Sequence, residues 1–120
     1  MAKVESHRGL VVWQKAMDLA VESYRLTSKF PASETYRLVS QITRAAASVP
    51  ANIAEGNARA TKRDYANFVA IARGSLMETE TLLMLAIRLQ FVSQKETEHA
   101  LSLVTEVSKM LTALRSRLNG

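Results

Sequence analysis

The stretch QITRAAASVPANIAEG, residues 41–56, decides the fold of this chain. Its apolar residues keep a helical spacing on both sides of Pro50, which predicts one helix over about residues 34–57. Proline inside a helix removes a backbone donor and crowds the carbonyl four residues earlier, here that of Ala46, so we expect a kink. The alternative is a break at this point, with Ser48 capping a new short helix.

The rest of the chain supplies three more helical segments, at about residues 10–29, 62–90 and 94–118. Ser93–Glu96 reads as a capping box that opens the last of them. Short connections join the four helices, so successive helices should be antiparallel neighbours. We expect a single all-α domain over residues 1–120, built as an up-down-up-down antiparallel four-helix bundle.

Composition excludes several classes of protein. The chain has no cysteine, which excludes disulfides, thiolate metal sites and cysteine nucleophiles. Its start is polar, and no run approaches the ~18 apolar residues that span a membrane, so we expect a cytoplasmic protein with no membrane role. The net charge of +5 favours a polyanionic partner such as RNA or DNA, or reflects only a solvated basic surface.

The first and third helices carry more apolar surface than one core requires. Their apolar arcs are about twice the ~100° that a helix on the outside of a bundle needs, whereas the fourth helix has one ordinary stripe. Large exposed apolar patches usually mark interfaces, so we expect self-association through these faces. The alternative is that both helices simply lie at the centre of the bundle.

Polar residues of the second helix form one stripe, namely Arg37, Gln41, Arg44, Ser48, Asn52, Glu55 and Arg59. Glu55 is expected to form a semi-buried bridge to Arg73 of the third helix, because a buried charge needs a partner. Ser48 and Asn52 would complete the hydrogen bonds. Glu80 shares the polar edge of the third helix with Arg73. Alternatively, the stripe binds an RNA phosphate or a partner.

Gly56 and Gly74 are both candidates for positions where two helices pack closely. Gly56 stands near the end of the second helix, where glycine also adopts a left-handed cap at little cost. Gly74 lies inside the third helix, in a row of small residues with Ala66 and Ala70. We expect this row to allow close helix approach, against the run 45–47, and a hinge is the alternative.

The tightest basic cluster is Arg59, Lys62 and Arg63, at the turn between the second and third helices. It is a candidate nucleic-acid contact, together with Arg37 and Arg44, or else a solvated turn. The aromatic residues fall mostly on apolar faces and no base-reading motif is present. Any binding should therefore be driven by the phosphate backbone and be sensitive to salt.

Catalytic patterns are missing from the sequence. The two histidines, His7 and His99, have no carboxylate at metal-ligand spacing on a shared inward face. Phosphate-binding loops and the nucleophile elbow are absent as well. We expect no enzymatic activity, no metal and no cofactor.

Several stretches resemble the 23S rRNA intervening-sequence protein family, also labelled S23. These are residues 11–16, 30–31, 34–38, 41–56 and 71–76, with Phe68 and Glu80. The resemblance covers nearly the whole chain. It implies an up-down-up-down bundle that assembles as a ring-like homopentamer. Genes of this family can lie inside intervening sequences of bacterial 23S rRNA genes, and many others lie elsewhere, so a bacterial origin is expected. The family resembles, more distantly, a basic pentameric accessory protein of diversity-generating retroelements, which binds a reverse transcriptase and nucleic acid.

The sequence therefore predicts a non-catalytic oligomeric bundle. Its expected partners are further copies of itself and RNA or DNA, or a nucleic-acid-processing protein. The expected role is that of a scaffold or accessory binder of nucleic acid without sequence specificity. The alternative is a protein–protein adaptor with no nucleic-acid role.

Overall fold

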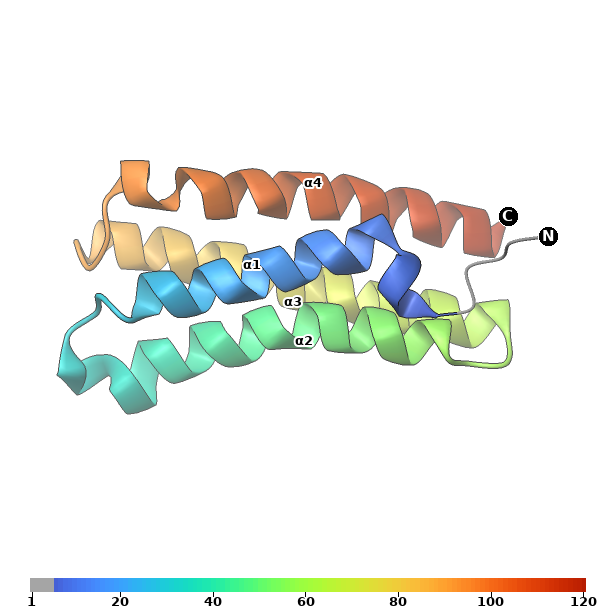
Figure 1. Cartoon of the computed structure of the whole chain (residues 1–120), viewed down its shortest axis with the longest axis horizontal. Coiled ribbons are helices and arrows are strands. Elements are labelled where there is room, and N and C mark those ends of the chain that lie inside the picture. Colours follow the sequence, from blue (N-terminus) through green and yellow to red (C-terminus); the bar gives the residue numbers. More distant parts are fainter. Residues whose placement is uncertain (1–5) are drawn as a thin grey trace.

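The computed structural model describes residues 6–120, in which four helices form an elongated antiparallel bundle of 49 × 25 × 22 Å (Figure 1). No strand occurs among these residues. The helices are α1 (Val11–Thr27), α2 (Ser40–Asn57), α3 (Lys62–Arg88) and α4 (Gln94–Asn119). Each helix packs against the helices before and after it, and α1 also packs against α4. The predicted all-α, four-helix architecture is confirmed.

The second helix begins later than the sequence predicted. A 3-10 turn at Ala32–Glu34 and a π-helical turn at Thr35–Val39 precede α2. Arg37 has φ −119° and ψ −105°, which are not helical values, so the chain changes direction before Ser40. A carboxylate oxygen of Glu34 accepts the backbone N–H of Leu38 at 3.4 Å, in place of a regular helical bond.

The α-helix α2 continues through Pro50 without interruption, so the alternative of a break with a new cap at Ser48 is wrong. A kink at Pro50 stays a prediction. The expected left-handed cap at Gly56 is also wrong, since no described glycine has a positive φ and Gly56 lies within α2. This glycine is buried where α2 meets α3, and an added Cβ would lie 2.8 Å from the Cβ of Phe68.

The connection between α3 and α4 is fixed by backbone hydrogen bonds. Gln90 adopts φ 64°, and its N–H donates to the Ile87 carbonyl at 3.0 Å. The Phe91 N–H donates to the Ala86 carbonyl at 3.0 Å, which completes a Schellman motif with glutamine at its left-handed position. The predicted capping box at Ser93–Glu96 then opens α4.

The core is aliphatic and fills the space between the four helices. Its largest fully buried aliphatic side chains are Leu19, Ile42, Ile53, Leu76, Leu83 and Leu111. The apolar surplus of α1 and α3 is left outside this core, as the sequence predicted. Val21 of α1 is 55% exposed and Leu89 of α3 is 48% exposed, whereas α4 exposes no large hydrophobic side chain. The alternative, that both helices are merely central, is wrong.

Candidate functional site

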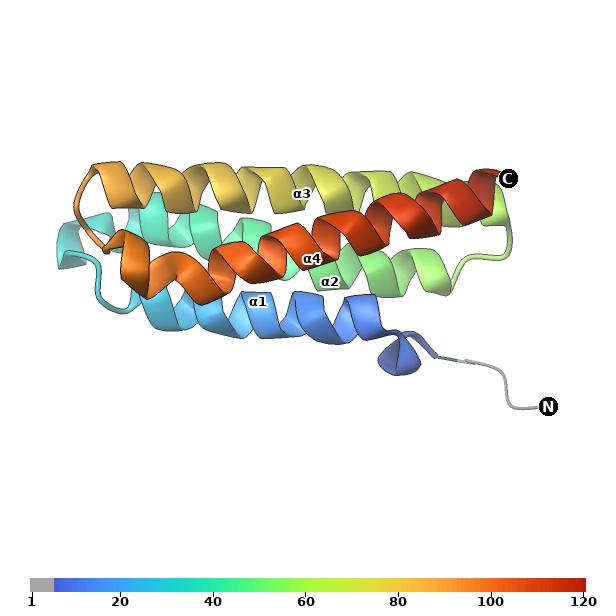
Figure 2. The ribbon, with the colours of Figure 1, turned by 90° about the horizontal axis from the view of Figure 1, so that it is seen from above.

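One end of the bundle gathers positive charge. The start of α1, the turn between α2 and α3, and the end of α4 all meet at this end (Figure 1 and Figure 2). Its exposed cations, which we call the basic end, are Arg8, Arg59, Lys62, Arg63, Arg115 and Arg117. Among residues 6–120, only Glu55 and Asp64 oppose them in the same segments, so the described part of this end carries a net charge of +4 in a chain whose total is +5.

Arg59 is the most constrained side chain of the basic end. Its Nη2 atom lies 2.9 Å from Oε2 of Glu55, and its guanidinium carbon lies 4.5 Å from the centroid of the Phe68 ring. Such cation–π contacts are worth ~0.5–1 kcal/mol at exposed sites. The ring and the carboxylate therefore hold Arg59 against the side of the bundle.

Lys62 and Arg63 are free by comparison. They are exposed, and within residues 6–120 neither has a carboxylate oxygen within 4.0 Å. Both occupy the first turn of α3, where the helix dipole disfavours positive charge by ~0.3–1 kcal/mol per residue. The positive charges of Lys62 and Arg63 therefore do not stabilise α3.

Arg37 and Arg44 do not join this cluster. Arg37 precedes α2 and its Nε lies 3.9 Å from Oε2 of Glu34, whereas Arg59 follows α2. The 18 residues of α2 separate the two by about 27 Å. Nη2 of Arg44 donates to Oγ of Ser40 at 3.3 Å. The five cations predicted as one nucleic-acid contact are thus divided along the bundle.

The predicted bridge between Glu55 and Arg73 is wrong. Glu55 pairs with Arg59 on its own helix, and Arg73 lies on the side of α3 that faces α4. A hydroxyl pair joins α2 to α3 instead, because Oγ of Ser48 lies 2.9 Å from Oγ of Ser75.

The amide of Asn52 extends this hydroxyl pair and does not complete the predicted bridge between Glu55 and Arg73. Its Nδ2 donates to the carbonyl of Ser48 at 2.8 Å and to Oγ of Ser48 at 2.9 Å. Sequence reasoning did not predict a role for Ser75. It considered the side of α3 that carries Arg73, and Ser75, two residues later, lies on a different side. Glu80 is half-buried on α3, seven residues beyond Arg73.

The small-residue row does not bring helices together at Gly74. An added Cβ at Gly74 would meet no atom within 4 Å, and the residue is exposed. The predicted close approach at Gly74 is therefore wrong within this chain. The close packing predicted at Gly56 is confirmed, since an added Cβ there would also lie 3.0 Å from Cδ1 of Tyr65.

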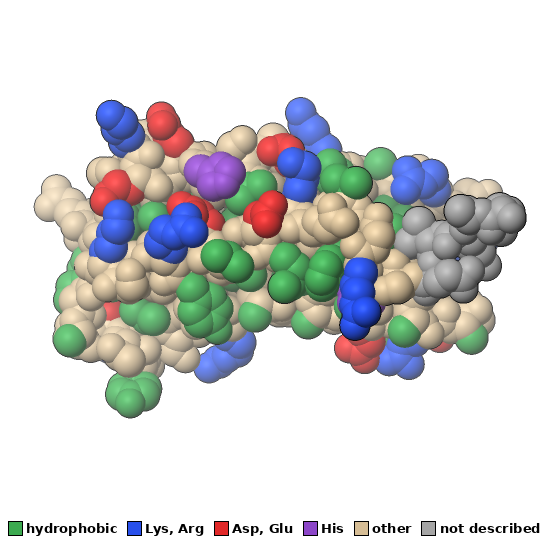
Figure 3. Space-filling view, viewed as in Figure 1, with side chains coloured by type: hydrophobic (Ala, Val, Ile, Leu, Met, Phe, Trp, Pro, Cys, Tyr) green, Lys and Arg blue, Asp and Glu red, His purple; other side chains and the backbone are tan. Residues whose placement is uncertain are grey.

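Two apolar stripes flank α2. The stripe on α1 comprises Met17, Val21 and Tyr24, and Tyr24 lines a surface hollow together with Val39 and Thr43. The stripe on α3 comprises the exposed Ile71, Leu85 and Leu89 with the half-buried Leu82, and these share a side with Ser75 at helical spacing. Met84, 53% exposed, lies apart from this stripe on the side of Arg73. Hydrophobic side chains spread over the face formed by α1 and α2, whereas charged side chains follow α4 (Figure 3).

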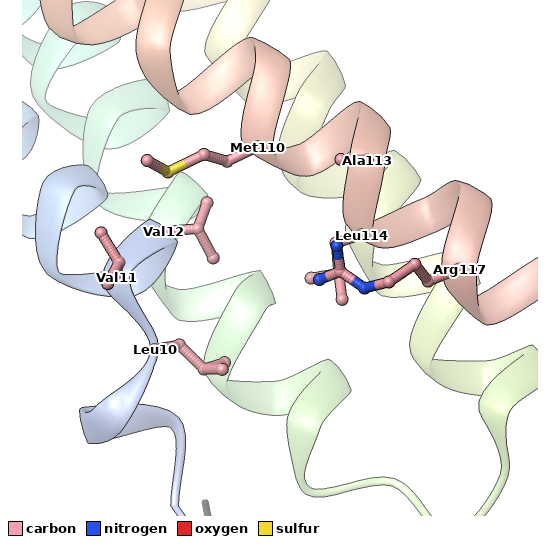
Figure 4. Close-up of a pocket in the computed structure, with 7 residues that line it drawn as sticks. All are labelled: Leu10, Val11, Val12, Met110, Ala113, Leu114 and Arg117. Atoms are coloured by element: carbon pink, nitrogen blue, oxygen red, sulfur yellow. The ribbon is translucent and has the colours of Figure 1, made fainter.

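A shallow hollow lies between the start of α1 and the end of α4 (Figure 4). Its volume is about 270 Å³ and its lining is Leu10, Val11, Val12, Met110, Ala113, Leu114 and Arg117. Arg117 supplies the one charged side chain of this lining, and the other side chains are apolar (Figure 4). The lining supplies no hydroxyl, carboxylate or imidazole that could act as a nucleophile or a general base.

A second depression lies between α3 and α4 and has a volume of about 330 Å³. Its lining consists of polar and cationic residues, namely Arg73, Thr112, Arg115, Ser116 and Asn119. Sequence reasoning missed this site, because its members come from two helices whose relative register is visible only in the fold.

Metal-ligating side chains do not cluster within residues 6–120. No three histidine, aspartate or glutamate side chains in this part of the chain gather into a group that could hold a metal ion. None of its helices is long and apolar enough to cross a membrane. The His7 ring packs edge-on against Trp13, with ring centroids 4.9 Å apart, and His99 is exposed on α4.

Comparison with known proteins shows the protein family of this chain. Residues 8–113 match the family model of the 23S rRNA-intervening sequence protein. The chain belongs to this family. A crystal structure of a protein of unknown function from the S23 ribosomal protein family of Bacteroides thetaiotaomicron superposes with a TM-score of 0.79 at 28% identity. The match covers 88% of this chain and 98% of the other. No curated protein sequence matches the chain.

Proposed function

We propose that this member of the 23S rRNA-intervening sequence protein family is a non-catalytic, self-associating bundle that binds RNA or DNA through its basic end. The observation that carries the proposal is the net charge of +4 at one end of a molecule whose total is +5. Lys62 and Arg63 support it further, because they stand where positive charge disfavours the helix.

Binding at this end should involve the phosphate backbone rather than the bases. The aromatic residues nearest to Lys62 and Arg63, Tyr65 and Phe68, are half-buried and already in contact with other groups, and Trp13 at the start of α1 is packed against the His7 ring. The Tyr65 hydroxyl accepts from Nδ2 of Asn57 at 3.3 Å, and Phe68 lies under Arg59. Without a free stacking surface, discrimination among sequences should be weak and the affinity should fall steeply with salt.

The apolar stripes beside α2 support self-association. Because both flank the same helix, one copy can bury them against neighbouring copies, and a ring of five is the order that the family resemblance implies. Such a ring would repeat the basic end once per subunit. Analytical ultracentrifugation of Leu85→Glu, with Thr105→Glu on α4 as control, tests this: the first variant should dissociate and the control should not. A wild-type chain sedimenting at 13.3 kDa at micromolar concentration would refute self-association.

Nucleic-acid binding is tested by fluorescence anisotropy with mixed-sequence RNA and DNA over a salt series. Replacing Lys62 and Arg63 with glutamate should abolish binding and should not destabilise α3, since acidic residues suit its first turn. Replacing Lys95 and Lys109 with glutamate changes the net charge equally, away from the basic end, and should retain most of the affinity. Absence of wild-type binding at low salt would favour the alternative, a protein–protein adaptor that uses the exposed stripes.

A further inference from the structure

We propose that the depression between α3 and α4, with Arg73 and Arg115 in its lining, binds phosphodiester groups of the nucleic-acid strand. This inference rests on the proposed function and extends it, because it adds a second contact beyond the basic turn. The site is defined by five residues: Arg73, Thr112, Arg115, Ser116 and Asn119.

Every side chain of the lining can donate a hydrogen bond. Arg73 and Arg115 supply planar guanidinium groups, which match the geometry of phosphate oxygens in bidentate fashion. Thr112, Ser116 and Asn119 add two hydroxyls and an amide. The lining contains no carboxylate, and within residues 6–120 neither arginine has a carboxylate oxygen within 4.0 Å. An anion is therefore the ligand that this chemistry favours.

The depression continues the basic end along the bundle. Lys62 precedes Arg73 by eleven residues, which is three helical turns, so the two lie on the same side of α3 about 16 Å apart. Asn119 and Arg115 stand on the facing helix, and α4 ends at Asn119. This row of donors is longer than one phosphate, since phosphates of a duplex strand follow each other every ~3.4 Å along the axis. A strand, rather than a free phosphate ion, fits its length.

The site stays open in the assembly proposed above. The apolar stripes flank α2, which lies on the other side of α3 from α4. The helix α4 exposes no large hydrophobic side chain that would draw it into the same interface. Self-association through the side of α2 would leave the face between α3 and α4 in solvent, where a strand can reach it.

The test compares the salt dependence of oligonucleotide binding between Arg73→Gln/Arg115→Gln and the wild type. If two phosphate contacts are lost, the negative slope of log K against log salt should become shallower by about 1.4 for a single strand. The control variant, Arg88→Gln/Lys109→Gln, removes one exposed cation from each of the same two helices and should keep the wild-type slope. Ser116→Glu retains both arginines, places a carboxylate in the depression and should also reduce the slope.

The outcomes separate this inference from the proposed function. Binding that depends on Lys62 and Arg63, but has the same slope in the Arg73→Gln/Arg115→Gln variant, would overturn only the second contact. No wild-type binding to any oligonucleotide would overturn both. Direct binding of pyrophosphate that the double variant abolishes, together with an unchanged oligonucleotide slope, would assign the depression to a free phosphate ligand and would also overturn the inference.

Discussion

The contact at Gly56 leads to a prediction whose sign is opposite to the usual one. Alanine in place of glycine inside a helix ordinarily stabilises by up to ~1 kcal/mol. At Gly56 the new Cβ would lie 2.8 Å from the Cβ of Phe68 and 3.3 Å from the carbonyl oxygen of Tyr65. Neither atom is the far end of a flexible side chain, so α2 and α3 themselves would have to move apart.

The size of the effect follows from these distances. Carbon atoms pack best at ~3.5–4.0 Å, so the two helices must separate by at least about 0.7 Å at this crossing. Overpacking of this kind costs ~1–3 kcal/mol. Because backbone atoms are involved, we use the upper part of this range, about 2–3 kcal/mol, as the cost of overpacking. The gain in helix propensity from glycine to alanine, up to ~1 kcal/mol, is subtracted from that cost. Gly56→Ala should then lower the free energy of unfolding by about 1–2 kcal/mol.

Gly74→Ala is the matched control, since it makes the same change inside a neighbouring helix. No atom lies within 4 Å of its added Cβ, so this variant should gain about 0.5–1 kcal/mol. Urea unfolding followed by circular dichroism measures both, at one protein concentration because association contributes to stability. The midpoints should move in opposite directions, with an unchanged m-value. A Gly56→Ala protein as stable as the wild type would refute the reasoning.

Two other predictions concern the ends of α3 and α4. Gln90→Gly should raise the free energy of unfolding by about 0.5–1 kcal/mol, because a backbone φ of 64° costs glutamine more than glycine. Urea unfolding measures this change, and a variant no more stable than the wild type would contradict the prediction. The hydrogen bond from the Ser93 backbone N–H, and then that from Lys29, lower the pKa of Glu96, so its charged form stabilises the fold. That stabilisation is present above the unfolded-state pKa and is lost as pH falls through the folded-state pKa. In thermal melts over an acid pH series, the advantage of wild type over Glu96→Gln should disappear at low pH, and a constant difference would contradict it.

Sequence patterns predicted the elements well where local chemistry decides them. The capping box at Ser93–Glu96 needs only residues that are neighbours in the chain, and the predicted start of α4 agrees with the structure. The apolar width of α1 and α3 was also readable, because helical periodicity alone places surplus residues outside a core. The irregular segment before α2 could not be predicted from the sequence, since no residue preference around Arg37 indicates the non-helical backbone angles found there.

Contacts between helices were harder to predict, because they depend on register and rotation. Glu55 and Arg73 both looked available for a bridge, yet a partner on the same helix was nearer to Glu55, and Arg73 faces α4. The depression beside Arg73 could not be found without knowing which residues of α4 lie opposite. Close packing was predicted at both Gly56 and Gly74, and only the crossing of α2 over α3 shows that Gly56 alone is crowded.

Packing and charge are coupled at the turn between α2 and α3. The absence of a side chain at Gly56 lets α3 approach α2 closely enough for Phe68 to lie under the Arg59 guanidinium. Because Phe68 and Glu55 hold Arg59, its charge stays beside the first turn of α3, where Lys62 and Arg63 add two more. The crossing that stabilises the bundle thus also concentrates its positive charge. Loss of the crossing should weaken nucleic-acid binding even in a variant that keeps all six cations of the basic end.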